Sequence, residues 1–262
     1  MNKLFVIKIG GNVLDDPATL TKFLADFAAI KEPKILVHGG GKQATKMGEQ
    51  LGINAKLING RRITDARTLD LVTMVYGGLV NKQLVARLQQ AGCNALGVTG
   101  ADGNLIKATK RPVEEIDYGF VGDIQPAGVN STLLYFLLQQ NTVPVFAPLT
   151  HADGVMLNTN ADTIASVLAI ALSRHFDVRL IFCFEKRGVL QNIHDDNSVI
   201  SVLTGDMYRQ LLKQGIFSDG ILPKLENALT AIHSGVREVL IGDAAHVSSN
   251  TGRETTGTLI IR

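Results

Sequence analysis

The stretch LFVIKIGG at residues 4–11 decides the fold of this chain, because it joins a buried strand to a glycine turn. Its first six residues are apolar except for Lys8. A short apolar run of this kind is typical of a strand that is buried on both faces of a parallel sheet. Lysines are rarely buried without a partner. The stretch therefore predicts a central strand whose lysine lies near the ligand-binding edge of the sheet.

A second stretch, ILVHGGG at residues 35–41, repeats the pattern of a buried strand followed by glycines. In open α/β sheets, ligands bind outside the carboxyl ends of the strands. Glycines there let backbone N–H groups converge on an anion, and the helix expected after Gly41 has an N-terminus that favours negative charge. The two turns together predict an anion site, although two ordinary strand-to-helix turns would show the same residues.

The remaining sequence alternates strands and helices, which predicts one α/β domain over residues 1–262. We expect a three-layer αβα sandwich with a mainly parallel central sheet. A boundary near residue 175 would divide an N-lobe, 1–174, from a C-lobe, 175–262. Helices are expected at 17–30, 47–51, 65–91, 130–140, 161–174, 205–214 and 223–234, further strands at 95–99, 143–148, 178–184, 238–241 and 258–261, and a β-hairpin excursion at 102–125.

Composition narrows the class of protein. With 45% hydrophobic and 19% charged residues, the chain fits a soluble globular enzyme. The net charge is only +2 and the Lys and Arg residues are scattered, so no nucleic-acid partner is expected. Cys93 and Cys183 lie in apolar runs and are expected to be free, buried thiols. No stretch has the length of a signal peptide core or a membrane span, so we expect no membrane partner and a cytoplasmic location.

The common nucleotide-binding fingerprints are missing from the sequence. Gly39-Gly40-Gly41-Lys42 does not have the G-x-x-x-x-G-K-[ST] spacing, and no G-x-G-x-x-G follows the first strand. Neither a P-loop enzyme nor a dinucleotide-binding Rossmann enzyme is supported.

Three further features are candidates for binding or catalysis. Lys224 follows Pro223 at an expected helix start, where a cation does not favour stability, so a ligand could explain it as well as a solvated surface position. The segment LNTNAD at 157–162 has more polar residues than one helix cap requires. Arg62 could clamp a carboxylate through two N–H groups, although single arginines are more often on the surface. No histidine is expected to act as a metal ligand or general base, and no metal site is expected.

Taken in order, these motifs resemble the amino-acid kinase family over nearly the whole chain, and within it the members that phosphorylate acylated glutamate. The motifs are IKIGG at 7–11, VHGGG at 37–41, NGRRIT at 59–64, GFVGD at 119–123, LNTNAD at 157–162 and Pro223-Lys224. Each motif is weak alone, but the ordered set is specific.

The resemblance implies roles for individual residues. Lys8 and Lys224 would stabilise charge on the transferring phosphoryl group, and Asp162 would hold both lysines. As catalytic residues it implies Lys8, Lys224, Asp162 and Gly11; as substrate-binding residues Gly40, Gly41, Arg62 and Asn158; and as ATP-binding residues Gly10, Phe184, Glu185, Gly188, Phe217 and Ser218. It also implies the cofactors ATP and Mg²⁺, with few protein ligands on the metal, and a homodimer.

The implied reaction moves the γ-phosphoryl group of ATP to the γ-carboxylate of N-acetyl-L-glutamate, an early step of arginine biosynthesis. The residue types suit it independently of the resemblance. A carboxylate nucleophile is already deprotonated and needs no base, so catalysis depends on positioning and on positive charge around two anions.

Two departures from the family pattern leave alternatives open. Glu185 stands where relatives usually carry Asp, which affects the expected ATP site. The chain begins almost at its first strand, without the N-terminal helix of arginine-inhibited hexameric relatives, which implies a dimer without arginine feedback. N-succinyl-L-glutamate or another small carboxylate could replace the acetylated acceptor, and a non-catalytic ligand-binding sensor is a further possibility.

Overall fold

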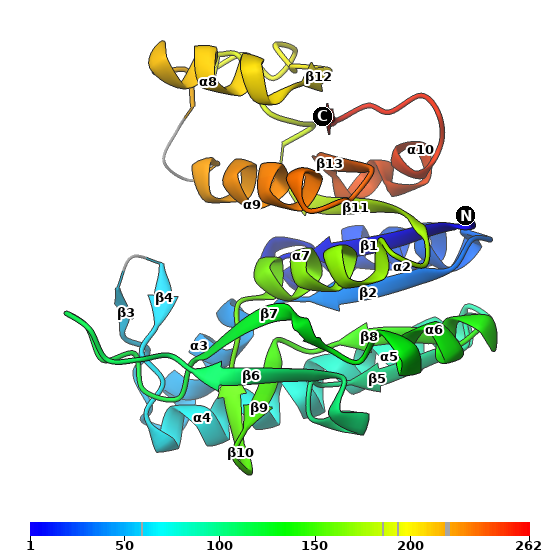
Figure 1. Ribbon diagram of the computed structural model, residues 1–262. Coiled ribbons are helices and arrows are strands. Elements are labelled where there is room, and N and C mark those ends of the chain that lie inside the picture. The colour runs from blue at the N-terminus through cyan, green and yellow to red at the C-terminus, as the bar shows by residue number, and fades with distance from the viewer. Residues whose placement is uncertain (59, 185, 193, 218–220) are drawn as a thin grey trace.

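The computed structural model describes residues 1–58, 60–184, 186–192, 194–217 and 221–262. Its main feature is an eight-stranded sheet with the order β12-β14-β13-β11-β1-β2-β8-β5, which runs from top to bottom in Figure 1. Its strands are β1 (Lys3–Ile9), β2 (Lys34–His38), β5 (Ala95–Val98), β8 (Val143–Phe146), β11 (Asp177–Phe184), β12 (Val202–Leu203), β13 (Glu238–Asp243) and β14 (Thr258–Ile260). The helices outside the long helix described below are α1 (Gly11–Asp15), α2 (Pro17–Ala29), α3 (Gly41–Gln50), α6 (Ser131–Gln139), α7 (Ala161–Leu172), α8 (Gly205–Lys213), α9 (Leu222–His233) and α10 (Val247–Thr251), with 3₁₀ turns η2 (Asp102–Asn104) and η3 (Ala244–His246).

Strand β1 lies inside the sheet and pairs in parallel with both β2 and β11. Its apolar residues are completely buried, which confirms the central strand predicted from the first stretch. Of the neighbouring pairs in this sheet, β13 and β14 run antiparallel and the others run parallel. The predicted mainly parallel α/β sheet is therefore confirmed.

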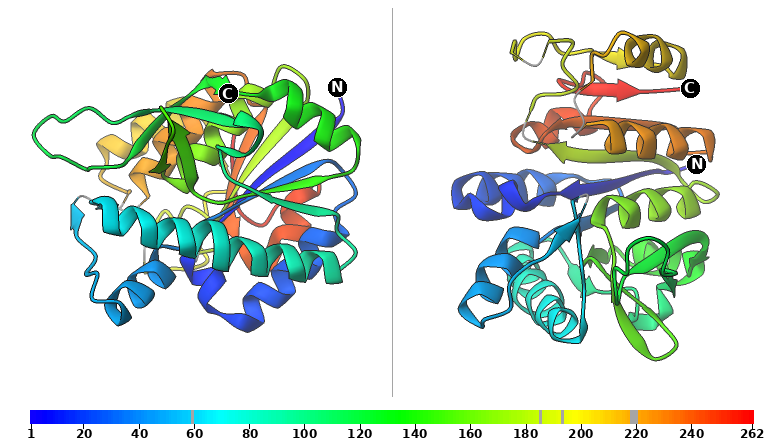
Figure 2. Two further views of the ribbon diagram at one scale, coloured as in Figure 1. Left: turned by 90° about the horizontal axis from the view of Figure 1, so that it is seen from below. Right: turned by 90° about the vertical axis from the view of Figure 1, so that its left-hand side faces the viewer.

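Helices cover both faces of the sheet, so the structure has the three predicted layers. Side chains alternate along β1: Phe5 and Ile7 belong to one apolar core, with residues of α2, and Leu4 and Val6 belong to the other, with residues of α7 and α9. The right-hand view of Figure 2 shows α2 (blue) and α7 (green) on opposite sides of the sheet. This alternation also decides which way Lys8 points, as described below.

The helix expected at 65–91 runs through α4 (Ala66–Val72), a π-helical segment η1 (Thr73–Val80) and α5 (Asn81–Gln90). The Gly77-Gly78 pair, which argues against an ordinary unbroken helix, falls in the π-helical part. A Cβ atom added to Gly77 would lie 3.3 Å from Leu149 Cδ1, so this glycine permits close packing on the neighbouring strand. π-Helical segments are often found at functional sites, and this one carries Tyr76 to the second glycine turn.

A second, four-stranded sheet has the order β10-β9-β6-β7 and lies beside the lower part of the main sheet (Figure 1). Strands β6 (Ile106–Lys110) and β7 (Gly122–Val129) are antiparallel, which confirms the hairpin expected within 102–125. A short hairpin of β3 (Leu57–Ile58) and β4 (Arg61–Arg62) projects on the same side of the molecule as the β6–β7 connection. This hairpin and the pairing of β9 (Leu149–Ala152) with β10 (Val155–Asn158) were not expected from the sequence.

The expected division into lobes 1–174 and 175–262 stays a prediction. Its boundary coincides with the connection between α7 and β11, but β11 pairs directly with β1, so the two proposed lobes share one sheet.

Candidate active site

Asp162 lies between two lysines that are far apart in the sequence. Lys8 Nζ is 2.8 Å from Asp162 Oδ1, and Lys224 Nζ is 2.8 Å from Asp162 Oδ2. The three side chains are 12%, 18% and 15% exposed for Lys8, Lys224 and Asp162 respectively. Burial alone would raise the pKa of Asp162, but the charges of Lys8 and Lys224 outweigh it and lower the pKa to about 2. The carboxylate is therefore ionised throughout the neutral range, and the cluster has a net charge of +1.

Local structure explains how these residues meet. Lys8 follows Leu4 and Val6 on the face of β1 that packs against α7, so its side chain points toward the start of that helix. Asp162 lies in the first turn of α7, where a carboxylate is favoured by the helix dipole. Lys224 lies in the first turn of α9, where the dipole opposes a cation, and Asp162 supplies the compensating charge.

The two glycine turns lie next to each other at the carboxyl ends of β1 and β2. Gly39 N donates to Ile9 O at 3.0 Å, and a Cβ atom added to Gly39 would lie 3.7 Å from Gly11 N. A Cβ atom added to Gly10 would lie 3.7 Å from Lys8 Nζ. The turns expected to converge are thus adjacent to one another and to the lysine.

Gly40 precedes α3 and is required by close packing. A Cβ atom at this position would lie 2.8 Å from Cδ1 of Tyr76. Gly41 begins α3, and a Cβ atom there would meet no atom within 4 Å. The space beside Gly41 is therefore open, and the first N–H groups of a helix favour an anionic ligand.

A cavity of about 420 Å³ opens beside these turns. Its walls include the four residues predicted to bind substrate: Gly40, Gly41, Arg62 and Asn158. This volume lies in the range of small-molecule sites.

Arg62 and Asn158 are both held in place by neighbouring groups. Arg62 is 9% exposed, and its Nη2 donates to Gly41 O at 3.0 Å and to Thr45 Oγ1 at 2.8 Å. Asn158 Nδ2 donates to Thr64 Oγ1 at 3.0 Å, which leaves its Oδ1 as an acceptor. A fixed guanidinium and a fixed amide are suited to orient a carboxylate and an amide N–H of a ligand.

The connection that precedes β7 is fastened across this region by backbone hydrogen bonds. Thr64 N donates to Tyr118 O at 2.9 Å, Phe120 N donates to Thr64 O at 2.7 Å, and Asn158 N donates to Phe120 O at 2.9 Å. A Cβ atom added to Gly119 would lie 2.2 Å from Thr64 O, so this glycine lets the two segments touch. The sequence motifs contained these residues but gave no role to Thr64 or Gly119.

His38 lies beneath the second glycine turn and is completely buried. Asn81 Nδ2 is 3.1 Å from His38 Nε2, so Nε2 accepts and Nδ1 donates to Gly39 O at 2.6 Å. Burial lowers the pKa of His38 to about 4. His38 is thus neutral at pH 7 and holds the turn.

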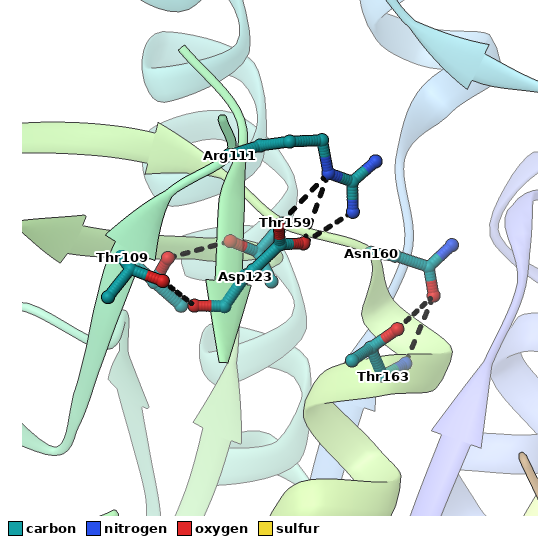
Figure 3. Close-up of polar contacts among 7 residues, drawn as sticks. Thr109, Arg111, Asp123, Thr159, Asn160 and Thr163 are labelled. Atoms are coloured by element: carbon teal, nitrogen blue, oxygen red, sulfur yellow. Dashed lines mark hydrogen bonds and ion pairs between the residues drawn. The ribbon is translucent and has the colours of Figure 1, made fainter. Parts of the chain in front are cut away.

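Arg111 and Asp123 also line the cavity, and the sequence gave neither a role. Arg111 Nε lies 3.1 Å from each carboxylate oxygen of Asp123, and Nη2 donates to Oδ1. Figure 3 shows this pair beside Asn160, whose Oδ1 accepts from Thr163 N at 3.0 Å and so caps α7. The sequence offered one indication that Asp123 belongs to the site, because Asp123 is the last residue of the GFVGD motif at 119–123.

Four of the six residues expected to bind ATP are described by the structure: Gly10, Phe184, Gly188 and Phe217. Phe184 ends β11 and its ring lies 5.8 Å from Lys224 Nζ. Gly188 packs where an added Cβ would lie 2.7 Å from Thr258 Oγ1, and Phe217 stacks on Tyr208 with ring centroids 5.6 Å apart. Glu185 and Ser218 lie outside the described residues. These ATP-binding roles stay predictions.

The described residues contain no group of three or more His, Cys, Asp or Glu side chains placed to hold a metal ion. Within the same residues, no helix is both long and apolar enough to cross a membrane. Cys93 and Cys183 are free and buried, as expected.

Comparison with known proteins places the fold and the sequence in one family. The profile of the amino acid kinase family matches residues 3–243. The chain is 56% identical to the acetylglutamate kinase of Parabacteroides distasonis over 253 residues, covering 96% of this chain and 98% of that protein. It is 52% identical to the acetylglutamate kinase of Cytophaga hutchinsonii, covering 100% of this chain and 99% of that protein. The crystal structure of smu.665 from Streptococcus mutans superposes with a TM-score of 0.76 at 30% identity, covering 98% of each chain.

Proposed function

This chain belongs to the amino acid kinase family, and from that premise we propose that it transfers the γ-phosphoryl group of ATP to the γ-carboxylate of N-acetyl-L-glutamate. The observation that carries the proposal is the pair of ammonium groups, Lys8 and Lys224, held on one ionised carboxylate. That carboxylate follows Ala161, which lines the cavity. The relatives named acetylglutamate kinase support the choice of acceptor.

The reaction needs no base from the protein. One oxygen of the acceptor carboxylate attacks the γ-phosphorus, the bond from that phosphorus to the β–γ bridging oxygen breaks, and ADP leaves with the electron pair. The difficulty is the approach of one anion to another, and the two lysine cations, with the N–H groups at the start of α3, would reduce that repulsion. Arg62 would hold the α-carboxylate of the acceptor, and the oriented Oδ1 of Asn158 is placed to accept from its amide N–H.

ATP would enter as its Mg²⁺ complex. The described residues offer no three-ligand cage, so the phosphates of the nucleotide would hold the ion, as is usual for Mg²⁺ at nucleotides. Asp162 is committed to its two lysines and is not counted as a ligand.

We also propose a cytoplasmic homodimer. Strand β5 ends the order of the main sheet, and its Leu96 is 41% exposed. Gln89 Nε2 and Lys82 Nζ donate to Ala95 O and Gly97 O on its outer edge, so a second copy would pack on the apolar side chain rather than pair with the strand. The free cysteines fit a reducing compartment. Light scattering during size-exclusion chromatography would test the assembly, and a mass near that of one 28.2 kDa chain would refute it.

The kinase proposal is tested by trapping its product. An acyl phosphate reacts with hydroxylamine to give a hydroxamate, so the protein with ATP and N-acetyl-L-glutamate should produce hydroxamate and ADP in equal amounts. Lys8→Ala should lower kcat at least about a hundredfold. Lys22→Ala removes an exposed lysine paired with Asp26 and serves as the matched control. Absence of hydroxamate with every acylated glutamate would refute the kinase proposal, and unchanged turnover in Lys8→Ala would refute the mechanism.

A further inference from the structure

The second glycine turn, Gly39–Gly41, has all three of its carbonyl oxygens bonded to the protein. Gly39 O accepts from His38 Nδ1 at 2.6 Å, Gly40 O from Ala44 N at 2.9 Å, and Gly41 O from Arg62 Nη2 at 3.0 Å. The N–H group of Gly40 differs, because no acceptor for it is found in the described part of the chain. Gly40 also lines the cavity, so this N–H is a candidate donor to a ligand.

The direction of the Gly40 N–H is set by His38. The carbonyl of Gly39 and the N–H of Gly40 belong to one peptide unit, and the two groups of a planar trans peptide point in opposite directions. His38 is completely buried, so its bond draws the oxygen inward and turns the N–H away from the imidazole. A peptide between two glycines has many other orientations open to it. The bond from His38 therefore decides which way the N–H faces.

Asn81 determines which nitrogen of His38 carries the proton. Asn81 Nδ2 lies 2.9 Å from Val145 O and 3.1 Å from His38 Nε2. A carbonyl oxygen can only accept, so Val145 O requires the NH₂ group of the amide on this side. The same NH₂ group then donates to Nε2, which leaves the imidazole proton on Nδ1, where it is donated to Gly39 O.

The orientation of Asn81 is not set by stability alone. Asn81 is 1% exposed, and its Oδ1 has no donor among the described residues, which is an unfavourable state for a buried oxygen. A Cβ atom added to Gly97 of β5 would overlap this Oδ1, so the sequence leaves room for the amide. Asn81 N donates to Tyr76 O, five residues earlier in the π-helical segment. The segment thus places Tyr76 against Gly40 and Asn81 against His38.

We propose that His38 and Asn81 are positioning residues for phosphoryl transfer, which together hold the N–H of Gly40 toward the transferring phosphoryl group. This inference rests on the proposed function, because it requires a phosphoryl group at the turn. In the transition state, charge is spread over the equatorial oxygens of that group. A donor that is oriented in advance needs no reorganisation when the charge develops. Loss of the orientation should therefore lower kcat and leave the KM for the acceptor nearly unchanged.

Steady-state kinetics of His38 variants test the effect on kcat. His38→Leu removes the donor to Gly39 O and keeps an apolar side chain, so kcat with ATP and N-acetyl-L-glutamate should fall at least about tenfold, while the acceptor KM changes less than about threefold. His38→Asn should recover part of kcat, because its amide nitrogen can take the place of Nδ1. Lys34→Met is the matched control: it removes another buried polar side chain of β2, which donates to Ala28 O and Ile30 O, and should keep kcat.

A double variant tests whether Asn81 acts through His38. Asn81→Ala alone should lower kcat at least about threefold, and its combination with His38→Leu should have a kcat within about threefold of His38→Leu alone. NMR of the ¹⁵N-labelled wild type at pH 7 should show the proton of the His38 imidazole on Nδ1. Thermal unfolding establishes that each variant is folded. If His38→Leu does not fold, His38→Asn and Asn81→Ala carry the same comparison of kcat with KM.

The outcomes separate this inference from the proposed function. Unchanged kcat in folded His38 and Asn81 variants of an active enzyme would overturn the inference alone. So would a raised KM at unchanged kcat, because the Gly40 N–H would then serve the bound substrate and not the transition state. A proton on Nε2, or losses that multiply in the double variant, would overturn the path from Asn81 through His38. No turnover of any acylglutamate by the wild type would overturn the proposed function and this inference with it, whereas the NMR result does not depend on activity.

Discussion

Replacement of Asp162 by asparagine is the most informative single change, because the structure predicts both its size and its dependence on pH. The pKa of Asp162 falls from 3.8 to about 2 on folding. A shift of about 1.8 units corresponds to about 2.4 kcal/mol in favour of the folded state at neutral pH. Asn cannot ionise and leaves Lys8 and Lys224 without their shared partner. We expect Asp162→Asn to lose about 2–4 kcal/mol of unfolding free energy at pH 7.

The sign of the pH effect follows from the lowered pKa. The stabilisation by ionised Asp162 is fully present above pH 3.8 and is lost as the pH falls toward 2. The difference between wild type and Asp162→Asn should therefore shrink by about 1 kcal/mol between pH 7 and pH 3. Urea titrations at the two pH values measure it, and steady-state ADP release should show a kcat at least about a hundredfold lower at pH 7.

A surface ion pair provides the control for this experiment. Asp177 pairs with Arg237, whose side chain is 67% exposed, and Asp177→Asn should cost less than about 1 kcal/mol. A loss in Asp162→Asn that is as small as the control, or that does not change with pH, would refute the electrostatic account of the lysine pair.

Three further predictions concern the glycine turn and the long helix. Gly40→Ala places a Cβ against Tyr76, so kcat/KM for the acceptor in steady-state kinetics should fall at least about tenfold. An unchanged kcat/KM would show that the turn can shift to accommodate the added Cβ. Gly78→Ala meets no atom within 4 Å and should raise the unfolding free energy by about 0.5–1 kcal/mol in urea titrations; a loss would mean that the π-helical segment requires glycine there. NMR of its imidazole should show that His38 titrates near pH 4. Because its pKa is lower in the folded state than in the unfolded state, the unfolding free energy should fall as the pH is lowered from 6.5 toward 4. Titration near pH 6.5 would contradict the buried, neutral histidine.

Local sequence patterns predicted the central elements of this fold because their signals are strong and short-range. A six-residue apolar run such as residues 4–9 has few alternatives to a buried strand, and a glycine pair directly after it leaves the strand's end open. The same patterns drew attention to Lys8, since a charge inside such a run requires a partner. The resemblance to the amino-acid kinase family implied that Asp162 holds Lys8 and Lys224, and the structure gives the distances from Asp162 to the two lysines.

Contacts between distant segments could not be predicted in this way. Tyr76 reads as an ordinary apolar position of a helix, and only the packed structure shows its ring against Gly40. Arg111 and Asp123 read as surface charges on a hairpin, and their place in the cavity depends on how that hairpin folds back. Thr64 gains its role from three chain segments that meet. Such roles depend on tertiary geometry and leave no periodic signal in the sequence.

The arrangement of charge explains why a carboxylate accompanies the two lysines. Two ammonium groups alone would repel each other and would lower each other's pKa, which would weaken them as donors to a phosphoryl group. Asp162 uses one oxygen for each lysine, so it fixes their spacing while it leaves a net charge of +1. A group that binds tightly to both reactants would gain nothing in rate, because only interactions that strengthen in the transition state accelerate the reaction. A moderate positive charge at a fixed place therefore suits the proposed transfer of a phosphoryl group between two anions.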